Sequence, residues 1–74
     1  MDISYGTIMK IKINDDYEIV TLINNSSGAD GFNCKVLDLS TFEILSDYKN
    51  IKDFKSNNNI EEILGYLDIY EVIK

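Results

Sequence analysis

The side chains that could do chemistry in this 74-residue chain are carboxylates, lysines, tyrosines and one cysteine, Cys34. The chain has no histidine. Without a histidine to act as base, a catalytic thiol is not expected, and we predict that Cys34 is a small buried hydrophobic side chain. Acid–base catalysis would then need carboxylates, lysines or tyrosines at a diagnostic spacing, and no such pair occurs. We therefore expect a protein that is not an enzyme.

The same composition argues against a bound metal or cofactor. A closed zinc site needs four ligands, mostly Cys or His, and they are absent. The loop over residues 24–31 lacks the spacing of a phosphate-binding loop and the oxygen ligands of a calcium loop. Asp15, Asp16 and Asp30 could together hold a weak divalent ion, but Asp is an ordinary turn residue. We expect no cofactor and no metal site.

Charge narrows the range of partners. Thirteen acidic residues face seven lysines and no arginine, which gives a net charge of −6. Nucleic-acid-binding proteins neutralise phosphates with Lys and Arg clusters, so we expect no direct binding of nucleic acid. An acidic surface either is simply solvated or steers the protein towards a basic partner, and imitation of nucleic-acid charge is one form of the second.

Five residues are candidates for binding a partner protein. Three are the acidic turn residues Asp15, Asp16 and Asp30, and two are the tyrosines Tyr48 and Tyr66, which lie beside predicted loops or turns. Tyrosine is enriched among the residues that dominate interface energies. Two other tyrosines, Tyr17 and Tyr70, are expected to be half-buried in the barrel instead.

The sequence also carries hints of location and origin. Its first five residues have no cationic region, and no stretch approaches the roughly 18 apolar residues of a membrane span. A lone cysteine fits a reducing compartment, so we expect a cytoplasmic protein without membrane association. The chain is rich in Ile, Asn, Lys and Tyr and lacks Arg, Pro and Trp. The favoured residues have A/T-rich codons, which points to a low-G+C bacterium or its phage.

Residues 17–23 predict the central element. In a strand, Tyr17, Ile19, Thr21 and Ile23 would share one face, with Val20 and Leu22 on the other. Apolar residues on both faces predict a strand in the middle of a sheet that is covered on both sides. Alternation and turn residues predict three further strands, at residues 7–14, 32–39 and 42–48.

The C-terminal third is less regular. Residues 49–59 predict an irregular connection or a short helical turn, pinned by Ile51 and Phe54. Asn59 and Glu62 resemble a helix-capping pair. Apolar residues then recur at helical spacing, at Ile60, Ile63, Leu64 and Leu67. We predict a helix over residues 60–66 and a last strand over residues 68–73; one helix to the C-terminus is the alternative.

Together these elements predict one small domain over residues 1–74, mainly β in class (small α+β). It would be a bent antiparallel sheet of about five strands, forming a partly open SH3-like barrel, with one short helix near the C-terminus. If the helix leaves apolar residues on one face of the sheet uncovered, we expect that face to be the interface of a homodimer. The predicted function is that of a small acidic accessory protein of a phage or mobile element, which binds or inhibits a host protein. The alternative is an oligomeric protein that sequesters a small ligand or nucleotide.

Overall fold

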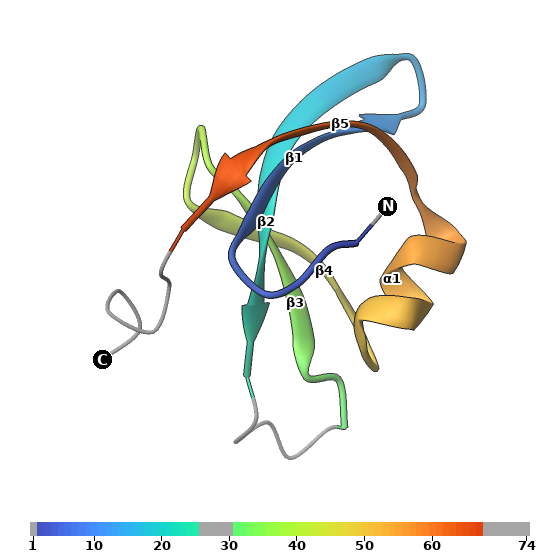
Figure 1. Ribbon diagram of the computed structural model, residues 1–74. Coiled ribbons are helices and arrows are strands. Elements are labelled where there is room, and N and C mark those ends of the chain that lie inside the picture. The colour runs from blue at the N-terminus through green and yellow to red at the C-terminus, as the bar shows by residue number, and fades with distance from the viewer. Residues whose placement is uncertain (1, 26–30, 68–74) are drawn as a thin grey trace.

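A computed structural model describes residues 2–25 and 31–67, which form one open antiparallel sheet and one short helix (Figure 1). The elements in chain order are β1 (Thr7–Ile13), β2 (Asp16–Asn24), β3 (Cys34–Asp38), β4 (Glu43–Tyr48), α1 (Ile51–Asn57) and β5 (Asn59–Tyr66). The strand order is β4-β3-β2-β1-β5. The mainly β fold with five strands and a short helix near the C-terminus is thus confirmed. β4 and β5 are not paired with each other, so the sheet is not closed, and the SH3-like barrel stays a prediction.

β2 is the central strand, as predicted. Val20 and Leu22 are fully buried and lie opposite Met9 of β1 and Val36 of β3, respectively. The other face of β2 is covered only in part, because Ile19 is 37% exposed. The prediction of a strand covered on both sides is therefore right for one face and wrong for part of the other.

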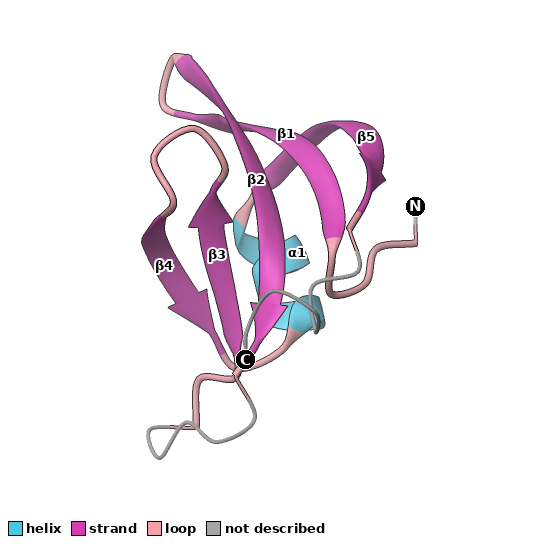
Figure 2. Ribbon diagram, turned by 90° about the vertical axis from the view of Figure 1, so that its left-hand side faces the viewer, coloured by secondary structure: helices cyan, strands magenta, loops and turns pink. Residues whose placement is uncertain are grey.

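α1 supplies the cover for the buried face, as Figure 2 shows. Its one fully buried side chain, Phe54, joins a core formed by Met9, Ile11, Val20, Leu22, Cys34 and Val36. The side chain of Asn50 caps the helix by accepting a hydrogen bond of 2.8 Å from the backbone N–H of Asp53. The short helical turn expected in residues 49–59 is therefore the helix of the protein, and Cys34 is buried as predicted.

The residues with helical spacing lie in a strand, so the predicted helix over residues 60–66 is wrong. Ile60 lies opposite Ile11, and Ile63 lies opposite Met9, because the register between β1 and β5 shifts twice. Each bulge adds one residue to β5. A step of two residues along β1, from Met9 to Ile11, therefore corresponds to a step of three residues along β5, from Ile63 to Ile60. The side chains of β5 that face the core thus recur every three residues, as they would on a helix. The predicted strand over residues 68–73 lies outside the described residues.

The turn between β3 and β4 is held by Asp38. Its Oδ1 accepts hydrogen bonds from the Ser40 hydroxyl (2.7 Å) and from the Ser40 backbone N–H (2.8 Å). The Asp38 carbonyl oxygen accepts a third, of 2.7 Å, from the Phe42 N–H. The bonds from Ser40, the hydroxyl's first, lower the pKa of the Asp38 carboxyl below its usual value. The turn therefore has a fixed shape while Asp38 is ionised.

Gly6 fastens the start of β1 to two other parts of the chain. Its N–H donates to the carbonyl oxygen of Leu22 (2.9 Å), and its carbonyl oxygen accepts from the N–H of Leu67 (2.7 Å). The φ of Gly6 is +94°, in a region that residues with a Cβ rarely adopt. A Cβ there would also clash with the carbonyl oxygen of Leu67.

We expect Gly6→Ala to destabilise the protein by about 2–4 kcal/mol, because it adds backbone strain and a backbone clash. The measurement is the free energy of unfolding in urea. Gly65→Ala is the matched control, since its Cβ would only touch Ile8 Cδ1 at 4.0 Å. Equal effects of the two substitutions would contradict the close approach at Gly6.

Acidification should remove the stabilisation that the ionised Asp38 carboxylate provides. The folded-state pKa lies below the unfolded-state value of about 3.9, so the stabilisation is complete above that value and is lost as the pH falls from there through the folded-state pKa. In Asp38→Asn the amide oxygen still accepts from Ser40 but does not ionise. The difference in unfolding free energy between wild type and D38N should be constant near neutral pH and shrink in acid. A difference that did not change with pH would show that the carboxylate charge has no role in the turn.

Candidate functional site

The backbone conformation and the exposure of Phe42 are not explained by a contribution to the stability of the fold. It ends the β3–β4 turn with a φ of +59°, where glycine is the favoured residue. A side chain with a Cβ costs about 1–2 kcal/mol in this conformation. Burial does not offset that cost, because Phe42 is 71% exposed. A strained backbone position that carries an exposed aromatic ring is a candidate contact site.

The exposed apolar surface continues from Phe42 along the edge strand β4. Ile44 is 51% exposed and Leu45 is 42% exposed. Leu45 is the extra residue of a bulge, because Ile44 lies opposite Leu37 whereas Ser46 lies opposite Val36. We call Phe42, Ile44 and Leu45 the β4 surface. It exposes three large apolar side chains within four consecutive residues, as does the segment of Leu64, Tyr66 and Leu67 at the end of β5.

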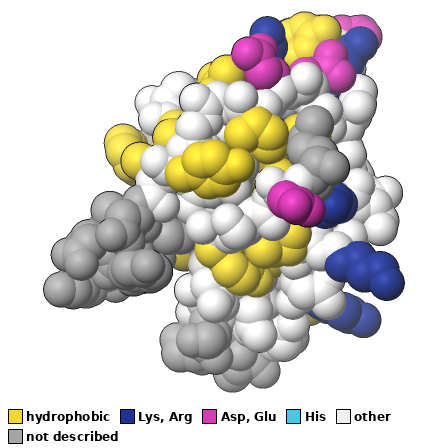
Figure 3. All heavy atoms as spheres, viewed as in Figure 1, with side chains coloured by type: hydrophobic (Ala, Val, Ile, Leu, Met, Phe, Trp, Pro, Cys, Tyr) yellow, Lys and Arg dark blue, Asp and Glu magenta, His cyan; other side chains and the backbone are white. Residues whose placement is uncertain are grey.

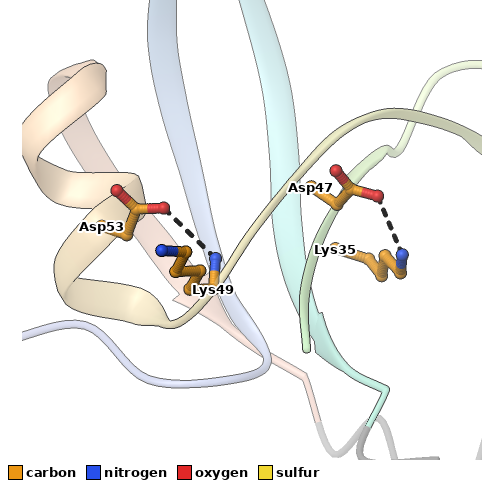
Figure 4. A network of polar contacts seen from close by, with 4 residues as sticks. All are labelled: Lys35, Asp47, Lys49 and Asp53. Atoms are coloured by element: carbon orange, nitrogen blue, oxygen red, sulfur yellow. Dashed lines mark hydrogen bonds and ion pairs between the residues drawn. The ribbon is translucent and has the colours of Figure 1, made fainter. Parts of the chain in front are cut away.

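The β4 surface adjoins a shallow depression of 380 Å³ on the face of the sheet opposite α1. Ile23, Asn24, Asn25, Lys35 and Ile44 line it. The rim carries an ion pair of 2.9 Å between Lys35 Nζ and Asp47 Oδ2, which joins β3 to β4 (Figure 4). The depression thus offers apolar side chains with a polar border, which is the usual anatomy of a protein contact.

A second depression, of 390 Å³, lies between the N-terminal segment and α1. Asp2, Ile3, Ile51, Lys52, Lys55 and Ser56 line it. Figure 3 shows that basic side chains gather on this side of the molecule, near α1. In Figure 4 the Asp53 carboxylate accepts a 3.2 Å hydrogen bond from the Lys49 backbone N–H, just before the helix. This is the most basic region of an otherwise acidic surface.

The structure does not bring the predicted partner-binding residues together. Asp15 and Asp16 are exposed at the β1–β2 turn, and Tyr66 is 65% exposed at the other end of β1, opposite Thr7. Tyr48 is half-buried, and its hydroxyl accepts a 3.0 Å hydrogen bond from Asn58 Nδ2. Asp30 lies outside the described residues.

Tyr48 has a clear structural role. Its ring packs edge-on against Phe54, with 5.6 Å between ring centroids. This contact and the bond to Asn58 hold the middle and the C-terminal end of α1 against β4. Tyr48 is therefore less available for a partner than its position beside a loop suggested.

Tyr17 lies on β2 beside two lysines. Its side chain is 48% exposed, and the ammonium groups of Lys10 and Lys12 lie 4.8 Å and 5.9 Å from its ring centroid. Lys12 lies opposite Tyr17, which follows Asp16 in β2. Figure 3 shows basic and acidic side chains next to one another at this end of the molecule. The end of the molecule that carries the acidic turn is therefore of mixed charge.

The buried thiol is not suited to nucleophilic chemistry. Burial, supported by the negative charge of Asp53, raises the pKa of Cys34 to about 11, against a weaker opposing effect of a hydrogen bond with Tyr5. Burial likewise raises the pKa of the Tyr5 hydroxyl. Both groups stay protonated at neutral pH.

Within residues 2–25 and 31–67, no group of three or more Cys, Asp or Glu side chains is placed to hold a metal ion. Among the same residues, no helix is long and apolar enough to cross a membrane.

The β4 surface was not among the predicted site residues. Its three residues lie within the strand predicted over residues 42–48, to which no binding role was assigned. The available signal was the turn sequence after Asp38, which ends on Phe where glycine would be favoured. Comparison of the chain with known protein families, with curated proteins and with solved structures found no match.

Proposed function

We propose that this protein is a small non-enzymatic binding domain that contacts another protein through the β4 surface. The observation that carries the proposal is Phe42, a large aromatic side chain held exposed in a conformation that favours glycine. Aromatic side chains are common among the few residues that dominate binding energy. The hydrogen bonds of Asp38 hold the turn before binding, which lowers the entropy lost on association.

A basic protein is the partner that the charge of the chain favours. The net charge is −6, and Glu43 lies directly beside Phe42. Opposite charge on the partner would speed association and orient the two surfaces. In the form suggested by the composition, the domain belongs to a phage or mobile element and binds, or inhibits, a protein in the cytoplasm of its host.

The alternative function, sequestration of a small anionic ligand such as a nucleotide, draws support from the depression beside α1. Lys52 and Lys55 line that depression, and lysine is a common phosphate ligand. Three observations weigh against this function: the negative net charge, the absence of arginine and the openness of the depression. A nucleotide-like absorbance in the purified protein would favour it over protein binding.

We expect Phe42→Gly to weaken partner binding about tenfold or more, because it removes the central aromatic contact. Stability should be unchanged or rise by up to about 1 kcal/mol, because the released strain exceeds the added entropy of the unfolded chain. A partner captured from a lysate of a low-G+C bacterium would be titrated calorimetrically against wild type and F42G. Tyr66→Ser, which removes the other highly exposed aromatic side chain, is the control and should bind normally. Loss of binding in Y66S alone would place the contact at the end of β5 instead.

We expect the double substitution Asp15→Lys and Asp16→Lys to slow association with a basic partner several-fold at low salt. The effect should disappear near 1 M salt, where the screening length is about 3 Å. Stopped-flow mixing at several salt concentrations measures both. Glu61→Lys with Glu62→Lys changes the net charge equally, on β5, and should have less effect. Equal slowing by both pairs would mean that net charge alone matters and that the β1–β2 turn has no role.

A further inference from the structure

We propose that β4 binds an extended basic segment of the partner as an additional antiparallel strand of the sheet. This inference rests on the proposed function and specifies its mode of recognition. An edge strand offers a row of backbone N–H and C=O groups that a second chain can pair with. Within the described chain, β4 pairs with β3 alone, so its other side is open.

The hydrogen bonds between β3 and β2 show which backbone groups of β4 point away from β3. The N–H of Leu39 donates to the carbonyl oxygen of Ile19, and the N–H of Asn25 donates to that of Asn33. Odd-numbered residues of β3 are therefore the ones that bond to β2. Successive residues of an antiparallel strand point their backbone groups to opposite sides, so the even-numbered residues of β3 bond to β4.

The same alternation continues into β4. Cys34 and Val36 lie opposite Tyr48 and Ser46, which therefore direct their backbone groups towards β3. Asp47, between them, directs its N–H and C=O towards the open edge. A strand added along this edge would bond to Asp47, and its side chains could reach Ile44 and Phe42.

The second edge of the sheet is less suited to strand addition. β5 contains two register shifts, and its residues Glu61 and Glu62 are exposed. Bulges and charged side chains are the usual devices that keep an edge unpaired. β4 has one bulge, and its two acidic residues, Glu43 and Asp47, are separated along the strand, whereas Glu61 and Glu62 are adjacent.

Charge on β4 selects a basic segment over a second copy of this chain. Glu43 and Asp47 lie near the two ends of the strand. A second copy of this chain would bring a further net charge of −6 and the same two carboxylates to this edge. Like charges directly across strands are destabilising, whereas Lys or Arg opposite Glu43 would be stabilising.

The test uses a capped six-residue peptide of alternating lysine and valine as the probe. We expect it to shift the backbone amide resonances of β4 in NMR spectra and to slow hydrogen exchange at the Asp47 amide. A peptide with glutamate in place of lysine, and a lysine peptide N-methylated along one edge, should both fail to bind. Equal binding of the N-methylated peptide, shifts confined to the depression on the sheet face, or no binding at millimolar peptide would overturn strand addition.

Asp47→Pro removes the outward N–H without removing a bond between β3 and β4, and proline is tolerated at such edge positions. Asp47→Ala is its control, since it loses the same carboxylate and the ion pair with Lys35 but keeps the N–H. We expect D47P to bind the lysine peptide at least tenfold more weakly than D47A. Equal binding would overturn the inference, as would β4 shifts that depend on protein concentration without peptide, which would indicate self-pairing.

The two proposals fail separately. If Phe42→Gly weakens capture of the partner while D47P binds like D47A, the β4 surface binds protein but not by adding a strand. If neither substitution changes capture, both proposals are wrong. Loss of binding in both F42G and D47P, with D47A intact, supports both.

Discussion

The pairing of β5 with β1 shapes this protein more than any other contact. In a regular antiparallel pairing, each residue of β1 would lie opposite one residue of β5. Two bulges instead make β5 longer than the strand that it lines, and bulges increase local bend and twist. Ile60 and Ile63 are thereby kept facing the same side as Met9 and Ile11. The sheet curves around this side, and Phe54 of α1 fills the space that the curve encloses.

The curvature divides the sheet into a buried face and a partly open face. Val20 and Leu22 need a cover on the side of α1, and a helix of seven residues with a single buried ring is enough to provide it. No second helix is present in the described chain to cover the opposite side, where Ile19 and Ile44 remain exposed. Uncovered apolar side chains therefore occur near both edges of the sheet, at Ile44 and Leu45 of β4 and at Leu64 and Tyr66 of β5.

Strands β1 to β4 could be predicted from the sequence because their side chains alternate and polar residues separate them. The helix was misplaced for a physical reason: two bulges in β5 give inward-facing residues a spacing of three, close to the period of a helix. The true helix has too few apolar residues for a periodic pattern, although Ile51 and Phe54 marked the segment.

The exposure of Phe42 could not be predicted, for another reason. It depends on a backbone conformation set by Asp38 and Ser40, and hydrophobic alternation carries no information about φ. The charged turn at Asp15 and Asp16 was located correctly, but the contact of Lys10 and Lys12 with the ring of Tyr17 follows only from the strand register.

The bond between Gly6 and Leu67 also determines how the molecule would respond to mechanical tension. β1 and β5 run antiparallel, so Gly6 and Leu67 lie at the same end of the sheet. A force that pulls Gly6 and Leu67 apart would load the hydrogen bond between them first and then the ladder one pair at a time, rather than shearing all pairs together. The fold would therefore open like a zipper at low force, with β5 detaching first and exposing the ring of Phe54.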